Sequence, residues 1–375
     1  MTTIIEDHNI STTAATVDPA RTEALDERLL GSFTLGTELL TVELGRRLGL
    51  YEALADRGPS TAAELAADAG ITTRYASEWL DQQAHAGFVD AYGSEDAEGA
   101  RRFVLPAEFV PVLLDIDHPA HLIGTAPLLL GVAKTLPAVA DAYATSRGVE
   151  YAAFGDELRF GIASLNRPGF IGATRSWFET MPDVVERLDT GGTVLDAGCG
   201  VGWSSIGLAR AFPNTRVVGI DLDEKSVEEA RIHVAEAGLA DRVQILHGNA
   251  TDVAALRSAG PEGYDAVAVF QALHDMGEPA RALAAFREVL ADGGTVLIAD
   301  EHGGDHPAIP AEIGRVQRAM SVLHCTPATW AESDAVVNGT VLLASTLSDW
   351  RTEAGFERFE ILPVEHPFWT FYRLG

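Results

Sequence analysis

The segment that most constrains this chain runs from Val194 to Gly202, where an apolar run meets an aspartate and three closely spaced glycines. The apolar run is typical of a buried strand that ends at Asp196. The glycines of the following loop are Gly198, Gly200 and Gly202. Because glycine adopts left-handed conformations and lets a ligand approach the backbone, this loop predicts a ligand site at the N-terminus of a helix that begins at Trp203.

The spacing of these glycines separates the loop from the dinucleotide-binding fingerprint. That pattern, G-x-G-x-x-G, would place its third glycine at position 203, where this chain has Trp203. Asp196 stands before the loop, and a carboxylate there suits an ammonium and sulfonium ligand better than a diphosphate. We therefore expect a nucleoside ligand with positive charge, and a purely structural glycine turn is the alternative.

Strands and helices alternate after the glycine segment begins. Expected strands cover 193–197, 216–221, 243–246, 264–270 and 294–300, and expected helices cover 203–212, 224–237 and 279–290. Two further helices, near 314–325 and 346–354, and two strands, near 356–362 and 368–372, follow. The predicted fold class is α/β, with a Rossmann-like, seven-stranded, mainly parallel sheet that carries an antiparallel edge.

The first 120 residues predict a winged-helix-like unit. Apolar residues recur at helical spacing over 35–55, a short helix over 61–69 ends at Gly70, and a third helix from Thr72 or Thr73 to about 86 leads into a hairpin that ends near 103–104. This pattern often binds DNA. However, residues 1–120 contain 8 Arg and no Lys against 21 Asp and Glu, and DNA binding depends on cations that neutralise phosphates. We expect no nucleic-acid partner, and a ligand-sensing regulator is the least favoured alternative.

Composition narrows the partners further. A formal net charge of −28 disfavours nucleic acid and anionic membrane surfaces, and no apolar stretch approaches the roughly 20 residues that cross a bilayer. Two cysteines, Cys199 and Cys325, are too few for a disulfide framework, which fits a cytoplasmic protein. The first residues have no signal-peptide character. We expect a disordered tail over 1–20, a winged-helix-like domain over 21–120, a helical linker over 121–188 and a ligand-binding domain over 189–375.

The linker is expected to consist of helices broken near Gly148 and at Pro168 and Pro182. Several of its side chains, with two from the helix near 314–325, are candidates for a substrate pocket. They are Tyr151, Asn166, Arg167, Phe170, Trp177, Met320 and His324. An ordinary helical core is the alternative for any one of them.

Polar residues follow the second and third expected strands of the ligand-binding domain. Asp221 ends the second strand, where a carboxylate can accept hydrogen bonds from both ribose hydroxyls, and Leu222 could pack on a base. Asn249, followed by Ala250, could hold an adenine amino group through its side-chain oxygen. The alternative for Asn249 is a turn residue that caps the next helix.

The segment 196–202, Asp221, Asn249 and the turn Leu273-His274-Asp275-Met276 together resemble the class I, Rossmann-like methyltransferases. With its winged-helix front, the chain is similar to the actinobacterial small-molecule branch, which is related to plant-type and antibiotic O-methyltransferases. The resemblance implies S-adenosylmethionine as cofactor, a small-molecule acceptor, and a homodimer whose front domain serves dimerisation and covers the active site. Such enzymes usually carry Asp where this chain has Asn249.

The resemblance also implies catalytic residues. In the plant-type relatives a His-Asp pair after the fourth strand supplies a general base, and the matching residues here are His274 and Asp275. Asp300, or the adjacent Glu301, matches the acid that orients this base. The usual aromatic-tryptophan-serine continuation is replaced by Met-Gly-Glu-Pro, and His274 as a structural residue is the alternative.

Two residues at the end of the fourth strand, Phe270 and Gln271, complete the expected cofactor site. Their backbone groups are expected to contact the methionine part of S-adenosylmethionine. Methylation at oxygen of a secondary metabolite is the first expectation for the activity. Methylation at nitrogen or carbon comes next, followed by a non-methylating enzyme on the same fold.

A last cluster, His302, Asp305 and His306, has metal-binding residue types, and His324 stands beside Cys325. Nothing in the sequence fixes these side chains on one face of an element. We interpret them as solvated loop residues and expect no metal.

Overall fold

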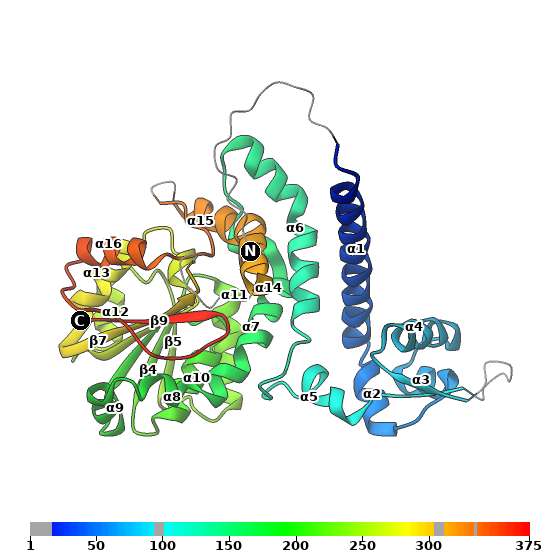
Figure 1. The fold of residues 1–375 in the computed structure, drawn as a ribbon. Coiled ribbons are helices and arrows are strands. Elements are labelled where there is room, and N and C mark those ends of the chain that lie inside the picture. Colours follow the sequence, from blue (N-terminus) through cyan, green and yellow to red (C-terminus); the bar gives the residue numbers. More distant parts are fainter. Residues whose placement is uncertain (1–16, 94–100, 304–310, 334–335) are drawn as a thin grey trace. The chain divides into compact units, whose positions relative to one another are not determined.

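The computed structural model describes residues 17–93, 101–303, 311–333 and 336–375. Its contacts divide the chain into two units, Met1–Leu114 and Asp115–Gly375 (Figure 1). None of the helices within the described ranges is sufficiently long and apolar to span a membrane.

The first unit contains four helices followed by a hairpin. These elements are α1 (Pro19–Arg47), α2 (Leu50–Arg57), α3 (Ala62–Ala69), α4 (Thr73–Ala86), β1 (Asp90–Tyr92) and β2 (Arg102–Val104), and the short α5 (Val110–Leu113) follows. Thr61 and Glu64 form a capping box at the start of α3, Gly70 ends that helix in the left-handed conformation, and Thr72 caps α4. The strands pair antiparallel. The helix-turn-helix and wing expected from the sequence are therefore confirmed.

The start of this unit differs from expectation. The sequence predicts a disordered tail over 1–20 and an amphipathic helix or a helix pair over 35–55. Residues 1–16 lie outside the described residues, whereas α1 begins at Pro19, with Asp18 accepting a hydrogen bond from the Ala20 amide at 3.0 Å. Proline at the first helical position and an aspartate cap are strong start signals, so α1 extends well before the apolar spacing that predicted it.

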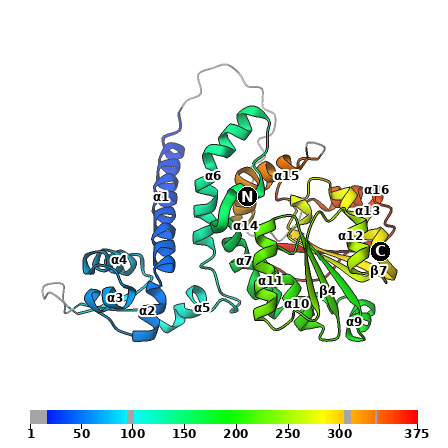
Figure 2. The same ribbon diagram turned by 180° about the vertical axis from the view of Figure 1, so that it is seen from behind.

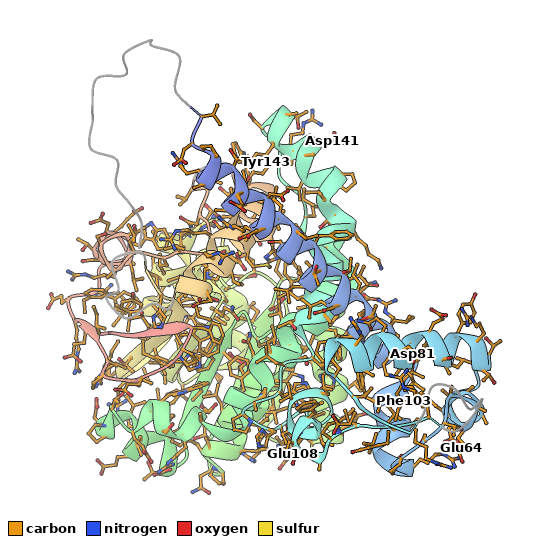
Figure 3. All side chains as sticks on the ribbon, turned by 45° about the vertical axis from the view of Figure 1, so that its right-hand side comes forward. Glu64, Asp81, Phe103, Glu108, Asp141 and Tyr143 are labelled. Carbon is orange, nitrogen blue, oxygen red and sulfur yellow. The ribbon has the colours of Figure 1, made fainter. Side chains whose placement is uncertain are left out.

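The surface of the helix-turn-helix is acidic. Glu64 on α3 and Asp81 on α4 are labelled in Figure 3. Arg74 on α4 pairs with Glu78 one turn away, and Arg101 pairs with Asp81 at 2.6 Å. These guanidinium groups are thus engaged with carboxylates of the same unit.

The second unit is built on a seven-stranded sheet in the order β5-β4-β3-β6-β7-β9-β8. Its strands are β3 (Thr193–Ala197), β4 (Arg216–Asp221), β5 (Val243–His247), β6 (Tyr264–Phe270), β7 (Leu290–Glu301), β8 (Phe359–Ile361) and β9 (Trp369–Leu374). The first five pair in parallel, and β9 pairs antiparallel with both β7 and β8. The predicted fold class, antiparallel edge included, is confirmed.

Helices cover both faces of this sheet, because successive strand residues point to opposite sides. One core cluster joins Val194, Val217 and Ala266 with α8 (Thr174–Phe178), α9 (Pro182–Asp189), α10 (Trp203–Ala211) and α11 (Glu224–Glu236). The other joins Leu195 and Val218 with α12 (Val253–Ala259), α13 (Pro279–Val289) and α16 (Ala344–Glu353). Figures 1 and 2 show the layers from front and back. The carboxyl ends of β3, β4, β6 and β7 consequently meet at one edge.

A helical layer lies at this edge of the second unit. It consists of α6 (Thr125–Thr145), the 3-10 turn η2 (Tyr151–Phe154), α7 (Gly155–Gly172), α14 (Ala311–Met320), the π-helical turn η4 (Ser321–Cys325) and α15 (Thr326–Glu332). Members of these elements share a hydrophobic cluster, and the Val149 amide donates to the Pro327 carbonyl at 2.9 Å. Segments more than 150 residues apart in sequence are thereby held together.

One predicted break in this layer is wrong. The sequence predicts a break between helices at Pro168, but α7 continues through Pro168 to Gly172. Pro168 is buried, and close packing of α7 on α10, where an added Cβ at Gly207 would collide with the Phe170 carbonyl, holds the helix in place. Tertiary packing thus overrides the local cost of proline within a helix. Pro182, in contrast, begins α9 as expected.

Candidate active site

The glycine loop lies between β3 and α10, and its three glycines serve two purposes. All three have positive φ. A Cβ at Gly198 would lie 2.6 Å from the Ala272 Cβ, and one at Gly202 would lie 2.9 Å from the Ala230 Cβ. At Gly200 a Cβ would meet nothing within 4 Å. Gly198 and Gly202 therefore permit packing, whereas the backbone at Gly200 borders open space that a ligand can approach.

Asp221, at the end of β4, fastens this loop. Its Oδ2 accepts a hydrogen bond from the Gly200 amide at 2.7 Å, and its Oδ1 accepts one from the Asp223 amide at 2.9 Å. Burial raises the pKa of Asp221, although these backbone bonds oppose the shift. The carboxylate fixes the loop and stands at the position expected to receive ribose hydroxyls.

Asp196 is buried at the end of β3. Its Oδ2 accepts hydrogen bonds from the Ser204 hydroxyl at 2.7 Å and the Ser205 hydroxyl at 2.5 Å. Its Oδ1 is buried and has no hydrogen-bond partner among the described residues. Burial raises the pKa of Asp196 to about 6. A buried carboxylate oxygen without a partner calls for a donor, and an ammonium group on a ligand supplies one.

The proposed adenine side of the site is more open. Leu222 is 49% exposed just beyond β4, an unusual position for a large apolar side chain beside a ligand loop. Asn249 is exposed, and its Oδ1 accepts a hydrogen bond from the Thr251 amide at 2.9 Å, which makes it a turn residue. Ala250 packs against the core cluster under α12. The structure therefore gives the Asn249 oxygen a structural partner in addition to its expected ligand.

His274 lies in the 3-10 turn η3 (Leu273–Asp275), which follows β6. The ring is 2% exposed, and its Nδ1 lies 2.5 Å from the Asp300 Oδ1. Its Nε2 lies 3.3 Å from the Asp275 Oδ1. Burial lowers the pKa of His274, but the two carboxylates outweigh it and hold the pKa well above its usual range.

This turn is adjacent to the glycine loop. Ala272, which precedes η3, is the residue that would collide with a side chain at Gly198, and the Met276 Cε lies 3.9 Å from the same hypothetical Cβ. The acid-paired histidine and the loop at the end of β3 therefore form one continuous site at the carboxyl edge of the sheet.

The structure separates the roles of Asp300 and Glu301, which the sequence left open. Asp300 faces His274, whereas Glu301 accepts hydrogen bonds from the side-chain amides of Gln271, at 2.5 Å, and Gln317. Gln271 in turn accepts one from Asn166 at 2.5 Å and has a φ of +51°, a strained value for a residue with a side chain. Burial raises the pKa of Glu301 to about 7.

The sequence did not single out Gln317. Its Oε1 is buried without a hydrogen-bond partner among the described residues. Together with Asn166 on α7, Gln271 in the turn after β6 and Glu301 on β7, it forms a polar cluster. Glu301 could be named from its place at the end of a buried strand, but Gln317 has no comparable signal in the sequence.

Two expected pocket residues belong instead to the core. The rings of Phe170 and Trp177 are 8% and 3% exposed and pack with Phe270, Trp369 and Phe371. Phe170 on α7 and Trp177 on α8 fill the space between these helices and the sheet, because their large aromatic rings bury the most apolar surface there. Phe270 accordingly points its ring into this core, so it can meet a ligand only through its backbone.

The other pocket candidates lie in three places, one of which is the polar cluster described above, where Asn166 contacts Gln271. Arg167 pairs with Asp117 at 2.6 Å and places its guanidinium 3.7 Å from the ring centre of Trp203, beside the glycine loop. Tyr151 packs edge-on against His324 in the helical layer, and Met320 packs against the same hydrophobic cluster. The candidates therefore do not form a single lining.

The histidine cluster considered as a metal site is not assembled by the described residues. His302 is buried, with its Nδ1 2.9 Å from the Thr370 hydroxyl and its Nε2 2.9 Å from the His366 carbonyl. Asp305 and His306 lie outside the described residues. His302 thus has structural partners on both ring nitrogens.

Comparison with known proteins identifies the family. Residues 188–353 match the family described as a methyltransferase domain, and residues 36–114 match the Rv2258c-like winged HTH domain. A ubiquinone biosynthesis O-methyltransferase of Aromatoleum aromaticum is 31% identical over 186 residues, which are 49% of this chain and 73% of that protein. The chain belongs to the class I S-adenosylmethionine-dependent methyltransferases.

Other similar proteins share a part of the sequence or the fold. An uncharacterized protein of Synechococcus sp. is 33% identical over 124 residues, which are 33% of this chain, and the chain spans only 27% of that protein. The human N-acetylserotonin methyltransferase structure has a TM-score of 0.67 at 15% identity and covers 96% of this chain and 99% of its own. The mitomycin 7-O-methyltransferase structure has a TM-score of 0.64 at 20% identity, with 95% and 98% covered. At these identities the structures show a shared fold.

The residues of the methyltransferase fit S-adenosylmethionine. The unpartnered Asp196 oxygen can accept from an ammonium group, and Asp221 presents a carboxylate beside the glycine loop. The backbone at Gly200 borders open space that a ligand can approach. The ammonium group and the ribose of the cofactor therefore have candidate receptors, with room for the ligand beside them, at one sheet edge.

Proposed function

We propose that the methyltransferase transfers a methyl group from S-adenosylmethionine to an oxygen atom of a small-molecule acceptor, with His274 as general base. One observation supports this above the others: a buried imidazole held by Asp300 lies beside the glycine loop. When bound, the cofactor supplies an electrophilic methyl group on sulfonium. The protein must then align the acceptor and remove its proton.

In this proposal Asp300 is a positioning residue. Its Oδ1 accepts the proton of His274 Nδ1, which leaves Nε2 as the atom that takes the acceptor proton. Nε2 is bordered by Asp275, whose charge favours the imidazolium that forms. Asp196, Gly198, Gly200, Gly202, Asp221, Leu222, Asn249, Ala250, Phe270 and Gln271 stay the proposed cofactor residues.

On the acceptor side we assign two separate groups of side chains, the polar cluster of Asn166, Gln271, Glu301 and Gln317 and the ring of Tyr151. Glu301 of this cluster directly follows Asp300 on β7, and burial together with the charges of Asp221 and Asp275 raises the pKa of Tyr151. An acceptor with both an apolar ring and hydrogen-bonding groups suits this surface. This favours an aromatic or polyketide-like metabolite.

Methylation at oxygen is favoured over nitrogen because a neutral amine needs no base comparable to an acid-paired histidine. The names of two similar proteins, a ubiquinone biosynthesis O-methyltransferase and a mitomycin 7-O-methyltransferase, favour oxygen over both nitrogen and carbon. No metal is needed for this chemistry, so chelator treatment should not lower turnover.

The test uses purified protein, cofactor labelled in the methyl group and a panel of phenolic acceptors, with products characterised by mass spectrometry and NMR. We expect label in a methoxy group, and His274→Ala should abolish turnover while binding S-adenosylhomocysteine normally. His85→Ala, at an exposed histidine of α4, is the control. Label on nitrogen or carbon, altered products without label, or full activity of His274→Ala would each overturn the proposal.

The proposed macromolecular partner is a second copy of the chain. On α1, apolar side chains are exposed along the helix, and they are Leu25, Leu29, Leu30, Phe33 and Leu35, each at least 55% exposed. A 29-residue helix with this surface gains stability by pairing with an identical helix. The paired arginines of the helix-turn-helix support the expectation that DNA is not a partner. Cytoplasmic location stays a prediction.

A further inference from the structure

We propose that the methyltransferase contains a binding site for a soft divalent cation such as Zn²⁺, formed by His274, Asp275 and Cys325. The three residues come from η3 and from the end of η4, some 50 positions apart. Their ligand atoms lie within 4.8 Å of one another, and this is the one such group found in the described part of the chain. The site differs from the His302 cluster considered in the sequence analysis.

The donor set is one that zinc prefers. Imidazole nitrogen, thiolate sulfur and carboxylate oxygen are its usual protein ligands, at bond lengths of about 2.0 to 2.3 Å, which put ligand atoms roughly 3.5 Å apart. His274 Nε2 and Asp275 Oδ1 already lie 3.3 Å apart. The Cys325 sulfur lies within 4.8 Å of both atoms, so it would move closer to them when the cation binds.

The surroundings of these ligands match those of metal sites. His274 Nδ1 lies at hydrogen-bond distance, 2.5 Å, from the Asp300 Oδ1. A metal-ligating histidine usually donates the N–H of its other ring nitrogen to a carboxylate, a backbone carbonyl or water. Burial raises the pKa of the Cys325 thiol to about 12, and the hydrogen bond that its sulfur accepts from the Thr340 hydroxyl at 3.0 Å opposes this rise, so the thiolate forms as the cation binds. Asp275 Oδ1 has no hydrogen-bond partner among the described residues. Each ligand atom is therefore oriented or left available.

Binding is a ligand exchange without redox chemistry. The cation loses water molecules, the Cys325 thiol and the Nε2 of the imidazolium form of His274 each release a proton to solvent, and His274 then coordinates through a neutral Nε2. Three protein ligands leave one position for water or another small ligand. Because Nε2 is the atom assigned to acceptor deprotonation, the cation would inhibit methyl transfer. That consequence rests on the proposed function, whereas binding itself does not.

The test titrates Co²⁺ into the full chain without a histidine tag and follows the near-ultraviolet charge-transfer band of a thiolate-cobalt bond. We expect one Co²⁺ per chain, displaced by equimolar Zn²⁺, and loss of the band in Cys325→Ser. Cys199→Ser, which alters the only other cysteine, should retain the band. Thr340→Val should weaken Zn²⁺ binding by about 10- to 100-fold.

Circular dichroism and S-adenosylhomocysteine binding verify that each variant is folded, and Asp275→Asn is a second ligand variant that spares the thiol. The inference is overturned if wild-type protein shows no band at micromolar Co²⁺, if Cys325→Ser keeps it, or if Asp275→Asn and Thr340→Val both bind as tightly as wild type. The cobalt spectrum requires no acceptor. Its outcome is thus independent of whether His274 acts as a base.

Discussion

Asp300 Oδ1 lies 2.5 Å from His274 Nδ1, and both side chains are buried, at 0% and 2% exposure. The pair joins the end of β7 to the turn after β6. Its carboxylate determines which tautomer the imidazole adopts and, with Asp275, raises its pKa against the opposing effect of burial. This relationship yields the first prediction.

Turnover should depend on the deprotonated form of His274. Because the pKa of His274 is raised, kcat/KM should fall as pH drops through a value above the ordinary histidine pKa of about 6.5. Asp300→Asn should move this limb to lower pH and reduce kcat by about 10²- to 10⁴-fold, the usual worth of a general base. A pH profile of wild type and variant measures both. If the acidic limb of the kcat/KM profile lies at the same pH in Asp300→Asn as in wild type, a group other than His274 titrates there.

Asp221→Ala should weaken binding of S-adenosylmethionine. Each lost charge-assisted hydrogen bond is worth about 1.5 to 3 kcal/mol, and the variant also releases the Gly200 amide. Calorimetry of cofactor binding measures the effect. Asp241→Ala, at an exposed aspartate before β5, is the matched control. Equal affinities of the two variants would refute the ribose assignment.

Cofactor affinity should decrease in acid. Burial raises the pKa of Asp196 to about 6, so its carboxylate is ionised above that pH and attracts an ammonium group, and it becomes neutral below. We expect a constant dissociation constant above pH 6 and weaker binding as pH falls further. Asp196→Asn should bind weakly and lose this dependence. A variant with the wild-type pH dependence would show that another group is responsible.

Two glycine substitutions should separate binding from folding. Gly202→Ala forces a Cβ against Ala230 at φ +87°, so it should lower stability by about 1 to 3 kcal/mol, measurable as a lower Tm. Gly200→Ala is also strained by its φ of +50°, but its Cβ meets no protein atom within 4 Å, so it should destabilise the fold less than Gly202→Ala and lose more cofactor affinity. Reversed effects would mean that Gly200 does not border the ligand.

Polar substitutions on α1 should dissociate the dimer. Leu29 and Phe33 are 62% and 68% exposed one helical turn apart, and replacing both by Asp introduces like charges at the proposed contact. Light scattering after size exclusion should give twice the chain mass for wild type and one chain mass for the variant. A monomeric wild type would exclude the second copy as partner.

The sequence by itself determined the local elements of the cofactor half. The strands at 193–197, 216–221 and 264–270 were predicted with the bounds that the structure shows, because apolar runs bounded by turn residues specify buried parallel strands. The glycine loop was also identified from the sequence, because the spacing of glycines and their ability to adopt positive φ are local properties of the chain. Helix α12, which has only seven residues, gave too short a pattern and was not predicted.

Only the tertiary structure decided which side chains meet. Neighbouring strand residues point to opposite faces, so the sequence could not tell whether Asp300 or Glu301 reaches His274 until the position of β6 was known. Phe170 and Trp177 could equally line a pocket or fill a core, and burial against the sheet decided for the core. Cys325 lies beside His274 because η4 packs at the carboxyl edge of the sheet, a long-range contact that no local pattern encodes.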